Sequence, residues 1–186
     1  MDYNDYTEKK VRRLCDYKGV IIDVTLDQVE LPDGRLTVRE VCCHPGGVAV
    51  VAIDDEGGTY CVRQYRYPFD RHVVEIPAGK LEWNEDPLDC ARRELSEETG
   101  LEAEKWQALG YLLVSPGISS EKLYLYLATG LKEGVAHPDE GEFVEVLKMP
   151  FSELYRRVLS GEVSDGKTVA AVLKAVCMTE EGKKFT

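Results

Sequence analysis

The chain has 186 residues, and its 34 acidic and 23 basic side chains give it a formal net charge of −11. That length is sufficient for one substantial hydrophobic core. No apolar run approaches the length of a membrane span, and the polar N-terminal residues are unlike a secretory signal, so we expect a cytoplasmic protein without membrane contacts. Nothing basic clusters along the chain, which argues against a nucleic-acid partner.

The six cysteines form no C-x-x-C pair, and no histidine lies near them at a metal-ligand spacing. Several fall within strand or helix patterns, where a free cysteine behaves as a small buried hydrophobe. We therefore interpret them as structural residues of a protein in a reducing compartment.

The N-terminal part is expected to form an antiparallel β-hairpin. Alternating Val20, Ile22, Val24 and Leu26 indicate a strand over residues 18–31, Pro32-Asp33-Gly34 a turn, and residues 35–43 the returning strand. An isolated hairpin is marginal in water, so it must pack on the rest of the chain or on a second copy. The segment 44–47, HPGG, reads as a short hinge, which divides the chain into a hairpin subdomain, 1–45, and a main domain, 46–186.

The main domain is expected to mix strands and helices. Apolar and alternating patterns predict strands at 48–53, 59–65, 106–114, 122–129 and 141–147. Helical spacing of apolar residues follows Pro150 and recurs around Val169. This mixture predicts an α/β sandwich around a mixed sheet, with the N-terminal antiparallel β-hairpin as a small appendage.

A third helix is expected between Pro87 and Gly100. Asp86 suits the N-cap, Pro87 the first helical position and Gly100 the left-handed residue that ends a helix. Leu88, Ala91 and Leu95 form one stripe that should face a core.

Three carboxylates crowd an adjacent face of the same helix, because Glu94, Glu97 and Glu98 are spaced i, i+3 and i+4. Like charges at that spacing destabilise a bare helix by roughly 0.2–0.5 kcal/mol per pair. A hard divalent cation such as Mg2+ would reverse that sign, since it prefers oxygen ligands. Three glutamates alone are more typical of a solvated helix face.

The wider pattern favours the functional interpretation. Residues 79–101 read GKLEWNEDPLDCARRELSEETGL and meet every position of G-x5-E-x7-R-E-U-x-E-E-x-G-U, where U is aliphatic. This resembles the Nudix hydrolase family, whose members cleave nucleoside diphosphates linked to another group with the help of Mg2+. The resemblance implies a Nudix-type α/β/α sandwich, and it implies that Arg93 and Glu85 form a buried bridge between the loop and the helix.

Further segments resemble the ADP-ribose pyrophosphatase branch of that family. They are VRQYRYPFDRHVVEIPAG at 62–79, HPGGVAVVAIDDEG at 44–57 and GEFVEV at 141–146, together with Pro116 sixteen residues past Gly100. In this branch such a proline marks specificity for ADP-sugars, so the resemblance implies a nucleoside diphosphate sugar substrate. It also implies a homodimer, in which the N-terminal hairpin helps to wall the partner's active site.

The branch implies roles for individual residues. The backbone carbonyl of Ala78 and the carboxylates of Glu94 and Glu98 would hold Mg2+, or Mn2+ in its place, with Glu97 as a shared or outer ligand. Arg66 would contact the diphosphate, a task that suits the planar guanidinium. The remaining candidates for the substrate site are Arg39, Glu75, Pro116, Gly117 and Glu121. Arg39 fits a surface cross-strand charge equally well, Glu75 a local ion pair, and Glu121 a surface charge at the start of a strand.

The resemblance to the branch also implies that the general base lies on a loop before a late strand rather than on the motif helix. The acidic segment 137–142, HPDEGE, has a suitable composition, and Glu142 matches the branch better than Glu140. A solvated acidic loop is the structural alternative.

The mechanism so implied is metal-assisted hydrolysis of ADP-ribose to AMP and ribose 5-phosphate, with Arg93, Glu97 and Glu142 in the catalytic set. Hydrolysis of another nucleoside diphosphate sugar, such as GDP-mannose, is the alternative. A non-catalytic ligand sensor on the same fold is disfavoured by the intact motif.

Overall fold

The computed structural model describes residues 6–137, 141 and 143–178, which form two compact units. Unit 1 contains the described residues up to Gly46 together with Leu113–Lys122, and unit 2 contains Gly47–Leu112 and the described residues from Leu123 onward. The segment Leu113–Lys122 therefore belongs to unit 1, whereas the division expected from the sequence, 1–45 and 46–186, placed it in the main domain. Over the described ranges, no helix is long and apolar enough to cross a membrane.

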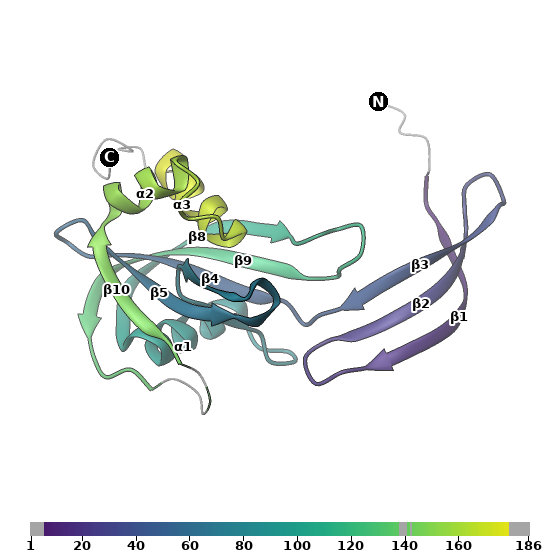
Figure 1. The fold of residues 1–186 in the computed structure, drawn as a ribbon, viewed down its shortest axis with the longest axis horizontal. Helices are drawn as coiled ribbons and strands as arrows, with labels where there is room; N and C mark the ends of the chain where they lie inside the picture. Colours follow the sequence, from purple (N-terminus) through teal and green to yellow (C-terminus); the bar gives the residue numbers. More distant parts are fainter. Residues whose placement is uncertain (1–5, 138–140, 142, 179–186) are drawn as a thin grey trace. The chain divides into compact units, whose positions relative to one another are not determined.

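Unit 1 is built on a three-stranded antiparallel sheet in the order β1-β2-β3 (Figure 1). Its strands are β1 (Lys9–Lys18), β2 (Asp23–Glu30) and β3 (Leu36–Cys43). The predicted hairpin corresponds to β2 and β3 and is confirmed, but β1 was missed. Its sequence, KKVRRLCDYK, lacks a period-2 pattern because the register against β2 shifts at two points, between Lys10 and Arg12 and between Arg13 and Cys15.

Charged contacts, rather than apolar packing, occupy the inner face of this sheet. Asp27 on β2 accepts a hydrogen bond from Lys10 Nζ at 2.7 Å and from Arg13 Nε at 3.2 Å, both on β1. Val29 is the single buried apolar side chain among the described residues of unit 1. The sheet therefore has very little core of its own.

The opposite face of the sheet is open and carries apolar side chains among polar ones, since Gln28 lies opposite Val38 and accepts a hydrogen bond from Arg12. Val24 and Leu26, the residues whose alternation indicated β2, lie on this face, because Thr25, Asp27 and Val29 point the other way and are buried. Register places Tyr17 beside Val24 and continues the face to Val38. Tyr17 and Val38 are 66% and 48% exposed, so the described part of this unit leaves large apolar side chains in solvent.

Unit 2 contains a seven-stranded mixed sheet. Its central path runs β10-β5-β4-β9-β8, with β6 paired to β5 and β7 paired to β4. The pair β4·β9 is parallel, and the other pairs whose register is defined are antiparallel. The strands are β4 (Gly47–Ile53), β5 (Gly58–Arg66), β6 (Arg71–Glu75), β7 (Ala78–Lys80), β8 (Leu101–Leu113), β9 (Lys122–Glu133) and β10 (Glu145–Pro150).

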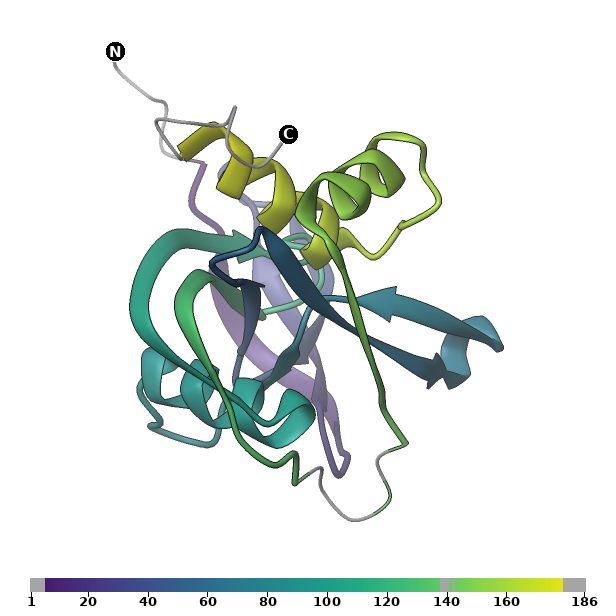
Figure 2. The same cartoon turned by 90° about the vertical axis from the view of Figure 1, so that its left-hand side faces the viewer.

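Helices cover both faces of this sheet. Figures 1 and 2 show α1 (Pro87–Thr99) on one side, and α2 (Phe151–Leu159) and α3 (Gly166–Met178) on the other. The predicted α/β/α sandwich around a mixed sheet is therefore confirmed. The short strands β6 and β7 were not predicted, and the last strand begins at Glu145 rather than at residue 141.

The motif helix α1 has the predicted ends, and two of the three residues predicted for its core face are buried, whereas Leu88 is only partly buried. The Asp86 carboxylate accepts the backbone N–H groups of Leu88 and Asp89, and Gly100 ends the helix with φ of 72°. Ala91 and Leu95 are fully buried against β4, whose seven residues are all buried. This packing fixes the side of α1 that carries the glutamates.

Candidate functional site

Two motif glutamates lie directly against the backbone of β7. The Glu98 carboxylate accepts the Ala78 N–H at 2.9 Å and is nearly buried. At the next residue, a Cβ on Gly79 would come within 1.8 Å of Glu94 Cδ, so only glycine admits the Glu94 carboxylate there. The sequence-predicted set of Ala78, Glu94 and Glu98 is thus brought together at the contact between β7 and α1.

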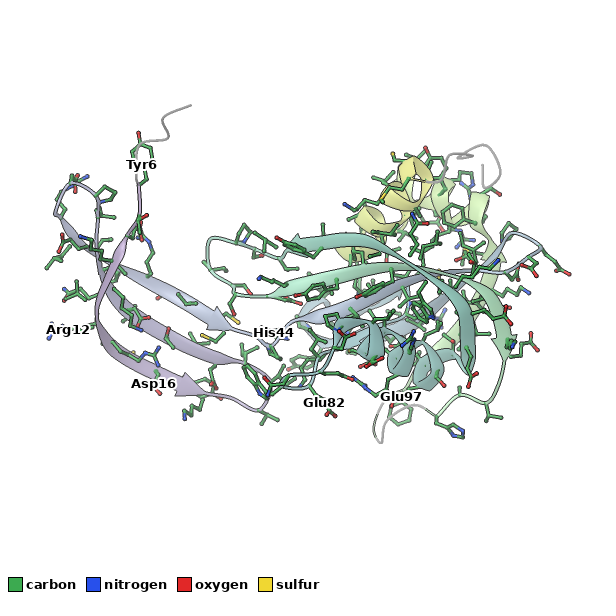
Figure 3. The ribbon with its side chains drawn as sticks, turned by 180° about the vertical axis from the view of Figure 1, so that it is seen from behind. Tyr6, Arg12, Asp16, His44, Glu82 and Glu97 are labelled. Carbon is green, nitrogen blue, oxygen red and sulfur yellow. The ribbon has the colours of Figure 1, made fainter. Side chains whose placement is uncertain are left out.

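Arg93 is the ionic centre of the motif. Its guanidinium donates to both carboxylate oxygens of Glu85, at 3.0 and 3.1 Å, and to Glu94 and Glu97 at 2.8 and 3.0 Å. These hydrogen bonds hold the pKa of Glu85 at about 2. The expected pair between loop and helix is therefore present, half-buried rather than buried, and it extends to two further motif glutamates. Figure 3 marks Glu97 on α1, with the preceding loop beside it.

The donor set suits a hard cation, although the described side chains do not form a complete metal-binding cluster. Carboxylates and a backbone carbonyl are the ligands that Mg2+ and Mn2+ take in proteins. Among the described residues, no group of three or more His, Cys, Asp or Glu side chains is arranged to hold a metal ion. Arg93 instead supplies positive charge to Glu94 and Glu97.

Arg66 and Glu75 form a second ionic pair at the ends of β5 and β6. Arg66 donates from Nε and Nη2 to the two oxygens of Glu75, each at 2.7 Å. Glu75 raises the pKa of Arg66 despite partial burial, and Asp165 and Glu98 add to that shift. Arg66 therefore lies within electrostatic reach of the motif helix, and Glu75 has the local ion pair that the sequence left as an alternative.

Two residues at the start of α3, Asp165 just before it and Lys167 within it, complete this pair and were not predicted from the sequence. Lys167 also bonds the Glu75 carboxylate and contacts Asp165 at 3.1 Å. Asp165 in turn accepts the Thr168 N–H at 3.0 Å, which is the N-cap arrangement of a helix start. That cap was the available signal, since aspartate three residues before an apolar helical run indicates an N-terminus.

The remaining described candidates lie in unit 1. Arg39 donates to both carboxylate oxygens of Glu8, which precedes β1, so its ionic partner lies outside the strands of the sheet. Pro116 and Gly117 lie on the loop that hydrogen-bonds to the end of β3 through Cys42. Glu121, at the end of this loop, has its carboxylate 4.0 Å from Nδ1 of His44.

Both candidates for the general base, Glu142 and Glu140, lie outside the described residues. The chain before them is held at α1, because the backbone N–H of His137 donates to the carbonyl of Glu97 at 2.9 Å. On the far side, Glu145 pairs with Arg63 on β5.

The two buried cysteines match the structural interpretation. Burial raises the pKa of both Cys61 and Cys90 to about 12, so these thiols stay protonated. Cys15 and Cys177, by contrast, are exposed, and all six cysteines are free.

The Glu85–Arg93 pair should make stability depend on pH. The folded pKa of Glu85 lies below its ordinary value of 4.5, so its stabilisation is complete above that value and is lost as the pH falls toward about 2. We expect Glu85→Gln to lower the free energy of unfolding by about 1–2 kcal/mol near neutral pH and to flatten its decline in acid. Denaturant unfolding at several pH values measures both effects.

Glu56→Gln is the matched control, because Glu56 is an exposed glutamate on the turn between β4 and β5. It should follow the wild-type pH profile. A Glu85→Gln profile parallel to the wild type would contradict the assignment of this pair to acid stability.

Comparison with known proteins identifies the family. The model of the NUDIX domain matches residues 44–172. The chain is 43% identical to the methanol dehydrogenase activator of Bacillus methanolicus, over 90% of this chain and 91% of that protein. It is 42% identical to the ADP-ribose pyrophosphatase of Bacillus subtilis, covering 89% and 90%, and 31% identical to a GDP-mannose pyrophosphatase of Yersinia enterocolitica, covering 71% and 74%.

A solved structure agrees at the level of the fold. The crystal structure of an ADP compounds hydrolase superposes with a TM-score of 0.81, covering 96% of this chain and 98% of that one at 21% identity. The match to the family model spans the β7–α1 contact on which the motif glutamates lie. The chain therefore belongs to the NUDIX family.

Proposed function

We propose that this Nudix enzyme hydrolyses the diphosphate bond of ADP-ribose to AMP and ribose 5-phosphate in the presence of Mg2+. The observation that carries the proposal is the contact of Glu94 and Glu98 with the Ala78–Gly79 backbone. It gathers hard oxygen ligands at one place in a chain that is 42% identical to an ADP-ribose pyrophosphatase.

Glu94, Glu98 and the carbonyl of Ala78 would hold the metal, with Glu97 as an outer ligand. When bound, Mg2+ supplies charge neutralisation at the diphosphate and acidifies water. For a chain with a net charge of −11, this neutralisation also removes the repulsion of an anionic substrate.

The chain's own residues orient the reaction. Arg93 fixes the motif loop to α1 through Glu85, which keeps the glutamates in register with β7. Arg66 presents a guanidinium to the diphosphate. The general base is Glu142, five residues after His137, whose backbone N–H is bonded to the carbonyl of Glu97.

Sequence identity to the relatives favours ADP-ribose over GDP-mannose as the substrate in this proposal. Identity to the ADP-ribose pyrophosphatase is higher and extends over more of the chain than identity to the GDP-mannose pyrophosphatase. A panel of nucleoside diphosphate sugars with Mg2+, scored by nucleotide release, tests the choice. Faster turnover of GDP-mannose than of ADP-ribose would overturn it.

The metal site is tested by Glu98→Gln. Glutamine keeps the shape and can still accept the Ala78 N–H, but it removes a charged ligand, so turnover should fall by roughly two orders of magnitude or more with the fold intact. Steady-state kinetics and circular dichroism measure the two properties. Asp89→Asn, on the exposed face of α1, is the control and should be nearly neutral. Wild-type turnover in a folded Glu98→Gln protein would refute the site.

The general base is tested by comparing two loop substitutions. Glu142→Gln should lower kcat by roughly two to four orders of magnitude while KM changes little, because a base contributes chemistry rather than affinity. Glu140→Gln should be mild. If Glu140→Gln is the crippled variant, the base is two residues earlier. If both variants stay active, the loop supplies no base.

Assembly follows from unit 1. Its sheet exposes Val38 and Tyr17 on one face and has almost no core of its own, so we propose that a second copy covers this face in a cytoplasmic homodimer. In that arrangement residues 1–45 serve dimerisation, and Arg39, Pro116, Gly117 and Glu121 contribute to the substrate wall.

Light scattering at micromolar concentration should therefore show a dimer. Val38→Asp should shift the equilibrium toward monomer, because it would bury a charge in the proposed interface. Val38→Thr keeps the branched shape without the charge and is the control. A stable and fully active wild-type monomer would contradict the proposed assembly.

A further inference from the structure

A cluster of charged residues outside the motif joins α3 to the ends of β5 and β6. Lys167 and Arg66 bond the same carboxylate, that of Glu75, and Lys167 also contacts Asp165. All four residues lie in unit 2. The proposed function gives Arg66 a contact with substrate and leaves Lys167 and Asp165 without a role.

The Glu75 carboxylate is deeply buried and is bonded by two cations, Arg66 and Lys167. Its side chain is 2% exposed, and a buried carboxylate requires close cations and hydrogen bonds to remain charged. Burial by itself would raise the pKa of Glu75, but Arg66 and Lys167 outweigh it and hold the pKa below its ordinary value. Without Lys167, only one cation would fix the position of this charge.

The geometry of the pair leaves one edge of Arg66 open. Nε and Nη2 face Glu75, which is the side-on arrangement of an arginine–carboxylate pair. Among the described residues, Nη1 has no hydrogen-bond partner, and the side chain is 40% exposed. A guanidinium has five N–H donors, so the outward edge can still bind two oxygens of a diphosphate.

The start of α3 is itself rigidly attached to the site. Asp165 accepts the hydroxyl of Thr168 at 2.6 Å, and this hydroxyl accepts the backbone N–H of Ile76 at 2.9 Å. Thr168 is fully buried, and Ile76 lies two residues before Ala78. The helix end that carries Lys167 is thus bonded to the short connection between β6 and β7, and β7 carries the backbone of the proposed metal site.

We infer that Lys167 is a positioning residue for the substrate diphosphate: it holds Glu75, and Glu75 holds Arg66 with its outward edge toward the diphosphate. This inference rests on the proposed function, since it needs an anionic group for Arg66 to bind. Lys167 itself does not contact the substrate, because its ammonium is committed to Glu75 and Asp165.

Steady-state kinetics of Lys167→Met on the best substrate of the wild-type enzyme test this chain of contacts. KM should rise about tenfold with kcat within about threefold, since the Arg66 contact to the diphosphate is made in the ground state and the transition state alike. Lys167→Arg keeps the charge and should recover most of the loss. Lys174→Met, on the same helix but outside the cluster, should leave KM unchanged.

A double-mutant cycle separates positioning from direct contact. In an Arg66→Ala background, Lys167→Met should cause no further rise in KM, because its effect passes through Arg66. Independent, multiplying effects would mean that Lys167 touches the substrate, and they would overturn the inference. An unchanged KM in Lys167→Met, with only a lower melting temperature, would overturn it equally. If Lys167→Met does not fold, Lys167→Gln replaces it in both arms.

A measurement without substrate tests the coupling between Lys167 and Arg66 separately from the proposed function. The Nε–H of Arg66, assigned by its absence in Arg66→Lys, should give a slowly exchanging NMR signal in the wild type and a fast-exchanging one in Lys167→Met. Persistence of the wild-type signal would refute the coupling, whatever the substrate. Inactivity of the wild type on every diphosphate sugar would refute the proposed function instead, and with it the substrate role of Lys167.

Discussion

The contact between α1 and the backbone of β7 is the constraint on which the site depends. Gly79 has no side chain because the Glu94 carboxylate occupies the space where a Cβ would be. The Glu98 carboxylate accepts the neighbouring N–H of Ala78. Such an approach is possible only because the other side of α1 is buried against β4, through Ala91 and Leu95. Core packing thus determines where the charged side of the helix meets the strand.

Two arginines near this contact each bond both oxygens of a glutamate through the Nε and Nη2 edge of the guanidinium. Arg93 is bonded to both oxygens of Glu85, and Arg66 to both oxygens of Glu75. Each pairing fixes the plane of a guanidinium, which a lysine could not do, because an ammonium is a point charge on a flexible chain. In an acidic protein, the binding of an anionic substrate depends more on where the nearby cations lie than on how many there are.

The sequence predicted what depends on local chemistry. Asp86, Pro87 and Gly100 delimited α1 correctly, because caps act within one turn of the helix. The resemblance to the family implied that Glu94, Glu98 and Ala78 form one set, and these residues do meet where α1 contacts β7. What it missed depends on partners distant in the chain. Strand β1 has no period-2 pattern because its register slips twice against β2, and β6 and β7 are three- to five-residue strands whose existence depends on β5 and β4.

Lys167 illustrates why residues whose partners are distant in the chain are not predicted from the sequence. A lysine at the start of a C-terminal helix is most often a solvated charge, and nothing local distinguishes this one. It becomes significant only because β6 ends in a buried glutamate that is 92 residues earlier in the chain. That glutamate already has an arginine, so a second cation is not needed for neutrality alone. It is needed to keep the carboxylate, and therefore the plane of the arginine, in one place, which makes precise orientation a product of the tertiary fold.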